Sequence, residues 1–131
     1  MPRIAHAVLD SQTGDACVIR ARRHTLTADE ALSHGGTDTG PAPYEIFVSA
    51  LAACTAITLR MVAQRKGWEL GAIRVDVELE KDERGVDRIA RTVSFGAPLN
   101  EEQRATLAEI AEKTPVTRTI KAGAPIETKF L

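Results

Sequence analysis

The two cysteines, Cys17 and Cys54, are the strongest nucleophiles that this 131-residue chain offers. They lack the CxxC spacing of a redox or zinc motif, and two cysteines are too few for a disulfide framework. We therefore expect free thiols in a reducing compartment. Cys54 lies inside a long apolar run, whereas Cys17 lies near charged residues and is interpreted as incidental.

Apolar side chains surround Cys54 if the run from about residue 44 to 66 is a helix. Positions three, four and seven residues away share its face, because a helix repeats every 3.6 residues. A single thiol in an apolar pocket suits an apolar oxidant or an acyl substrate, but a nearby arginine or a helix N-terminus is needed to stabilise the thiolate. On the residues alone, a small buried core residue is the more economical interpretation of Cys54. The neighbours expected around it are Phe47, Ala50, Leu51, Ile57, Thr58 and Met61.

Tyr44 and Glu45 are the polar side chains at the start of the same helix. Glu45 precedes Cys54 by nine residues, which places it about 180° around the helix at about 100° per residue. Tyr44 precedes it by ten residues, at roughly 80°, and is better placed to approach the sulfur. Stabilisation of the helix N-terminus by its negative charge is the simpler explanation of Glu45.

Neither a phosphate site nor a metal site is predicted. The Gly-rich stretch from Gly35 to Gly40 matches neither GxGxxG nor the Walker pattern, so we expect a structural loop. His6, His24 and His34 share no ligand spacing with each other or with a cysteine. The sequence therefore gives no reason to expect a metal or another cofactor.

Turn residues and hydrophobic periodicity divide the chain into strands and helices. The apolar alternation of Ile73, Val75, Val77 and Leu79 predicts a half-buried strand that returns as a hairpin. We expect strands at 4–9, 17–20, 23–27, 73–80, 89–95 and 125–130, and helices at 44–66, 101–113 and 115–121.

Two helix starts carry recognisable caps. Asn100 with Gln103 forms a capping-box variant, and Thr114 before Pro115 combines a good N-cap with proline at the first helical position.

The helix at 44–66 is apolar almost all round, which predicts that it is buried on every side. At 1.5 Å per residue it would be about 35 Å long, more than one sheet of so short a chain can easily cover. A homodimer would bury its other side. We thus predict one α+β domain over 1–131, an antiparallel sheet with a long buried central helix, in a homodimer.

Composition and charge set the broad class of the protein. Hydrophobic residues make up 44% and charged residues 27%, the balance of a folded globular domain. With 17 basic and 18 acidic residues the formal net charge is −1, without the basic excess of a nucleic-acid binder. No membrane span and no secretory signal are expected, which favours a cytoplasmic location.

Three groups of residues together resemble the OsmC/Ohr family of osmotically inducible and organic-hydroperoxide-resistance proteins. They are the loop and helix start at 35–45, the helix segments 50–56 and 58–61, and the tail motif 110–120 around Thr114-Pro115. The segment 23–30 is similar to the redox-type OsmC-like branch. The resemblance covers about residues 20–131.

This resemblance implies an intertwined homodimer with two sites at the interface and thiol peroxidase chemistry. Cys54 matches the family's peroxidatic cysteine, and Thr114 stands where its resolving cysteine is expected. Tyr44 occupies the position of the glutamate that follows proline in the hydroperoxide-resistance branch. Arg20 and Arg22 are the nearest candidates for the activating arginine.

Two functions follow as expectations, and whether the chain is an enzyme is left open between them. The first is reduction of organic hydroperoxides through a sulfenic acid at Cys54, with an external thiol as reductant and no internal resolving cysteine. The alternative is a non-catalytic dimer that binds a small apolar ligand in an interface pocket.

Overall fold

The computed structural model describes residues 1–131, which form two compact units, 1–47 and 48–131. The long helix α1 (Pro43–Lys66) begins in the first unit, and most of it belongs to the second.

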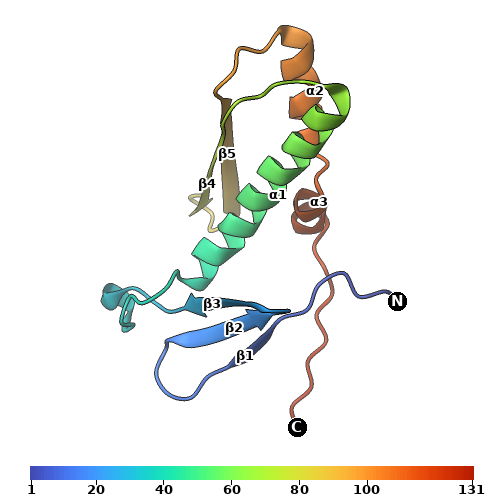
Figure 1. Ribbon diagram of the computed structural model, residues 1–131. Helices are drawn as coiled ribbons and strands as arrows, with labels where there is room; N and C mark the ends of the chain where they lie inside the picture. The colour runs from blue at the N-terminus through green and yellow to red at the C-terminus, as the bar shows by residue number, and fades with distance from the viewer. The chain divides into compact units, whose positions relative to one another are not determined.

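The first unit contains an antiparallel sheet with the strand order β1-β2-β3 (Figure 1). Its strands are β1 (Val8–Asp10), β2 (Cys17–Ala21) and β3 (His24–Ala28), and a short 3₁₀ turn, η1 (Leu32–His34), follows. The expectation of a strand over 4–9 was only partly right, since pairing with β2 begins at Val8.

The second unit contains a hairpin of β4 (Ile73–Lys81) and β5 (Asp87–Phe95), paired from Ile73 opposite Phe95 to Lys81 opposite Asp87. Successive side chains of a strand point to opposite faces. The face that carries Val75 and Val93 is half-buried. The opposite face, which carries the alternating residues such as Arg74 and Ser94, is exposed, as the alternation predicts.

Both predicted helix caps are confirmed. In α2 (Glu101–Ala111) the Asn100 side chain accepts from the Gln103 backbone N–H at 2.8 Å, and the Gln103 side chain accepts from the Asn100 N–H at 3.0 Å. In α3 (Pro115–Ala122) Thr114 is the N-cap and proline occupies the first turn.

The core of the second unit forms where α1, α2 and the inner face of the hairpin meet (Figure 1). Its fully buried members come from α1, α2 and the loop after α1: Leu59, Ala63, Leu70 and Leu107. Half-buried side chains pack around them, among them Trp68, Val93 and Phe95.

The expected strand at 125–130 is wrong. The chain after α3 has no regular secondary structure, and Ile126 and Phe130 are exposed. A strand needs a neighbour for its backbone N–H and C=O groups, and neither sheet of the chain pairs with this segment.

The expectation that α1 is buried on every side also fails for the single chain. Only a four-residue stripe of Leu51, Thr55, Leu59 and Ala63 is buried, whereas Ile57 on the same helix is 60% exposed. By length and composition α1 could cross a membrane, but core helices of soluble proteins pass that test too. We describe α1 as a core helix because Leu59 and Ala63 belong to the core.

Candidate functional site

Cys54 is half-buried on α1, on the turn before Thr58. Its Sγ lies 4.0 Å from the Thr58 hydroxyl oxygen, one helical turn away, as the spacing predicts. Both cysteines are free and both are half-buried. The helix therefore holds the Cys54 thiol beside a weakly polar neighbour, with partial access from outside.

Arg91, which the sequence analysis did not identify, lies beside Thr55, the residue that follows Cys54 on α1. Arg91 of β5 donates from Nη1 to the hydroxyl oxygens of Thr55 at 2.9 Å and of Thr117 at 3.0 Å. Its Nη2 donates to the Ala111 carbonyl oxygen at 2.9 Å. One guanidinium thus joins β5 to α1, to the end of α2 and to α3.

The acceptors of Arg91 are buried. Thr55 and Thr117 are almost fully buried, and the Thr55 hydroxyl also donates to the Leu51 carbonyl oxygen at 2.7 Å. A buried hydroxyl oxygen without a hydrogen-bond donor would lower the stability of the fold. Arg91 supplies that donor to Thr55 and Thr117. One feature of the sequence indicated Arg91. It is a charged residue on the strand face on which Val93 and Phe95 supply apolar side chains.

Thr114 serves a structural purpose in the chain. It is 1% exposed, its Oγ1 accepts from the Thr117 backbone N–H at 3.4 Å, and the two hydroxyls lie 2.6 Å apart. Because Thr117 accepts from Arg91, the N-cap of α3 belongs to the same hydrogen-bonded cluster. We call Thr55, Arg91, Thr114 and Thr117 the Arg91 cluster.

Tyr44 and Arg20 both belong to the first unit. Tyr44 is exposed on the first turn of α1, with its ring edge-on to Phe47 at a centroid distance of 6.5 Å. Arg20 is exposed on β2, and its guanidinium forms an ion pair with Asp10 at 2.6 Å. Arg22, the other arginine considered, has a positive φ of 54° after β2.

Glu45 acts at the helix start, as expected. Its Oε1 accepts from the Ala42 backbone N–H at 2.9 Å, and the Ala42 carbonyl accepts from the Ile46 N–H at 3.0 Å. The carboxylate therefore satisfies a donor before the first turn of α1.

A buried carboxylate, that of Asp29, organises the glycine-rich loop that leads into α1. It is 3% exposed, and its Oδ2 accepts from the hydroxyls of Thr37 at 2.6 Å and Thr39 at 2.8 Å and from both of their backbone N–H groups. These bonds, the Thr37 hydroxyl first, hold the pKa of Asp29 well below the ordinary range of a carboxyl group. The loop is structural, as predicted.

The glycine at position 36 is required by close packing within this loop. A Cβ at this position would lie 2.1 Å from the Glu30 carbonyl oxygen and 2.8 Å from an Asp29 carboxylate oxygen. The backbone therefore approaches Asp29 more closely than any side chain would allow.

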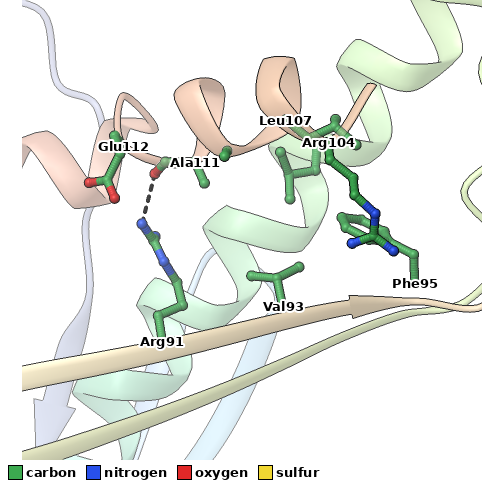
Figure 2. Close-up of a pocket in the computed structure, with 9 residues that line it drawn as sticks. Arg91, Val93, Phe95, Arg104, Leu107, Ala111 and Glu112 are labelled. Atoms are coloured by element: carbon green, nitrogen blue, oxygen red, sulfur yellow. Dashed lines mark hydrogen bonds between the residues drawn. The ribbon is translucent and has the colours of Figure 1, made fainter. Parts of the chain in front are cut away.

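Two pockets of the second unit meet at Arg91. One, of about 340 Å³, lies between β5 and α2 (Figure 2), and the other, of about 230 Å³, lies beside α3. Among the described residues, no group of three or more His, Cys, Asp or Glu side chains is placed to hold a metal ion.

Residues 36–129 match the family model described as OsmC-like protein. No curated protein matches the chain. Among solved structures, the OsmC-like protein from Mycoplasma pneumoniae superimposes with a TM-score of 0.78 at 18% identity, over 92% of this chain and 89% of that one.

Two further solved structures are similar over most of their length. The putative osmotic stress induced and detoxification response protein from Psychrobacter arcticus has a TM-score of 0.77 at 12% identity, covering 91% of this chain and 90% of that one. The organic hydroperoxide resistance protein OhrB of Bacillus subtilis has a TM-score of 0.61 at 26% identity and covers 91% of each chain.

Proposed function

The chain belongs to the OsmC-like protein family, and we propose that it reduces organic hydroperoxides through the thiol of Cys54. The observation that carries the proposal is the half-buried Cys54 thiol on the central helix, at the position where the family resemblance places a peroxidatic cysteine. A solved relative with 26% identity is an organic hydroperoxide resistance protein, which supports the same chemistry.

The first step transfers one oxygen atom. The Cys54 thiolate attacks the distal oxygen of the hydroperoxide, the O–O bond breaks, and Cys54 becomes a sulfenic acid. The alkoxide takes a proton and leaves as the alcohol. The sulfur is oxidised by two electrons and the hydroperoxide is reduced by the same two.

An external thiol completes the cycle. Its sulfur bonds to Cys54 Sγ and water leaves, which gives a mixed disulfide. A second thiol attacks that disulfide, so that Cys54 returns as a thiol and the two external thiols leave as a disulfide. This route uses no second cysteine of the chain, in keeping with the hydroxyl of Thr114 at the position where the family's resolving cysteine is expected.

The exposed apolar surface of α1 supports both an apolar substrate and a partner subunit. Ile57 and Met61, about one and two turns after Cys54, are exposed although both are large and apolar. A homodimer that covers this surface would create an apolar site around the thiol at the interface. A reducing cytoplasm is the location in which the external thiol would be available.

Arg20 and Tyr44 are kept as candidates for the activation of Cys54. Arg20 has the charge that stabilises a thiolate, and in this role it would exchange its ion pair with Asp10 for the sulfur. Tyr44 would supply a phenol hydroxyl in place of the family's carboxylate.

The second candidate function keeps the dimer and the apolar surface without the redox cycle. The observation in its favour is that the polar neighbour of the Cys54 thiol is the neutral hydroxyl of Thr58, 4.0 Å away, and not a cation. In that case Cys54 lines a site for a small apolar ligand, and Cys54→Ser leaves ligand binding intact.

One experiment separates the two functions. The reduced protein is exposed briefly to cumene hydroperoxide with dimedone present, and labelling of each cysteine is followed by mass spectrometry. We expect rapid labelling at Cys54 and slow labelling at Cys17, which is a matched control because it is equally free and half-buried. Equal rates at the two thiols would refute the peroxidase and favour the binding function.

A further inference from the structure

The pocket between β5 and α2 combines an apolar wall with charged ends (Figure 2). Its volume of about 340 Å³ falls in the range of small-molecule sites, about 300–1,000 Å³. The wall is formed by four side chains of α1, β5 and α2: Leu59, Val93, Phe95 and Leu107.

Two guanidinium groups lie at the ends of this wall. In Figure 2, Arg104 lies beside Phe95 at one end, and Arg91 lies toward Ala111 and Glu112 at the other. None of the ion pairs within 4.0 Å involves Arg91 or Arg104. The charge of Arg91 acts on Glu112 without a direct ion pair, and Arg104 forms no ion pair with a carboxylate of the chain.

Arg91 also keeps hydrogen-bonding capacity. An arginine side chain has five N–H donors, and three bonds are formed here, to Thr55, Thr117 and Ala111. No buried side-chain nitrogen or oxygen lacks a partner, so the Nε of Arg91, which donates in none of these three bonds, is not sealed away from solvent.

Glu112, the one acidic residue that lines the pocket, determines which end of the pocket favours an anion. Glu112 lies at the Arg91 end and is paired with Lys121 at 2.6 Å. The hydrogen bond and charge of Lys121, and then the charge of Arg91, lower the pKa of Glu112, which keeps it ionised. Its negative charge opposes an anion at that end, whereas nothing acidic from the pocket lining faces Arg104.

We propose that this pocket binds a small amphipathic carboxylate, with the apolar chain along Val93 and Leu107 and the carboxylate at Arg104. Burial of an alkyl chain against this wall is favourable because it removes apolar surface from water. A charge-assisted bond to a guanidinium fixes the orientation of the head group. An inorganic phosphate would leave the apolar wall unused.

This site is separate from Cys54. Leu59 follows Cys54 by five residues, which is about 140° around α1, and Cys54 does not line the pocket. The proposal therefore goes beyond the redox function and does not depend on it.

Octanoate is the probe, tested by isothermal titration calorimetry on the full chain, with Cys54→Ser measured in parallel. The fluorescence of Trp68, the only tryptophan, is a second readout because it packs against the core cluster that contains Leu59 and Leu107. We expect saturable octanoate binding, equal in both proteins, and at least about tenfold weaker binding of octanol and acetate.

Arg104→Gln tests the head-group contact, and Arg118→Gln on α3 is its matched control, because both arginines are exposed and only Arg104 lines the pocket. We expect Arg104→Gln to weaken octanoate binding about tenfold and Arg118→Gln to leave it unchanged. A second variant, Ala108→Phe, should fill the pocket and abolish binding. No binding of octanoate, equal binding of octanol, or an unaffected Arg104→Gln would each overturn the proposal.

Discussion

Arg91 and Thr55, 36 residues apart in sequence, are joined by a hydrogen bond of 2.9 Å from the guanidinium Nη1 to the threonine hydroxyl oxygen. Thr55 is the neighbour of Cys54 on α1, so this bond ties the helix that carries the candidate nucleophile to the hairpin. The same guanidinium donates to Ala111 at the C-terminal end of α2 and to Thr117 in the first turn of α3.

Replacing Arg91 by methionine should destabilise the chain. The change keeps an unbranched side chain but removes the three hydrogen bonds that the guanidinium donates, and it leaves the Ala111 carbonyl and the buried hydroxyls with fewer partners. We expect the free energy of unfolding in urea to fall by about 2–3 kcal/mol. Arg74→Met on the exposed face of β4 is the control, with a change of less than about 0.5 kcal/mol. Equal effects of the two variants would contradict a special contribution of Arg91.

Thr114→Ala should cost about 1–2 kcal/mol, because it removes the N-cap of α3 and the hydroxyl partner of Thr117. Thr114→Ser should keep most of the stability, since serine offers the same capping oxygen. Thermal unfolding followed by circular dichroism measures both. If alanine and serine were equally tolerated, the cap would contribute nothing.

Asp29 should make the first unit sensitive to acid. Its pKa is depressed in the folded state, so its contribution to stability is fully present above the ordinary carboxyl pKa of about 3.9 and is lost as the pH falls below that value. Asp29→Asn, which replaces an acceptor by an amide that also donates, should lower stability at neutral pH and flatten the acid limb of the stability curve. Asp15→Asn, at an exposed position, is the control. An unchanged pH profile in Asp29→Asn would rule the effect out.

Ile57→Glu should prevent formation of the homodimer that we propose, because it places a charge in the exposed apolar surface of α1. Sedimentation velocity should show a dimer for the natural chain and a monomer for the variant. Val86→Glu makes the same change at an exposed apolar residue of the hairpin turn and should stay dimeric. A natural chain that sediments as a monomer at micromolar concentration would count against the dimer.

Local signals predicted most of the elements. The alternation from Ile73 to Leu79, the Asn100 capping box and the Thr114-Pro115 start are confirmed because each depends on residues close in sequence. The strand expected at 125–130 failed because a strand also needs a neighbour, which no local pattern specifies.

The candidate site was predicted less completely. The helical placement of Cys54 and its contact with Thr58 follow from spacing alone. The Arg91 cluster could not be found in this way, because its members are far apart in sequence and meet only after α1, α2 and α3 pack on the hairpin. A charge among half-buried apolar positions of β5 was the only hint.

The register of the β4–β5 hairpin has a consequence for misfolding. A slip of β5 by one residue would turn its apolar side chains to the exposed face, and the hydrophobic effect penalises it. A slip by two residues keeps every side chain on its face and escapes that penalty, but it moves Arg91 by about 7 Å along the strand, away from Thr55 and Thr117. The guanidinium would then lose its acceptors in a half-buried place. A single arginine thus discriminates between hairpins that hydrophobic patterning alone would leave nearly equal in energy.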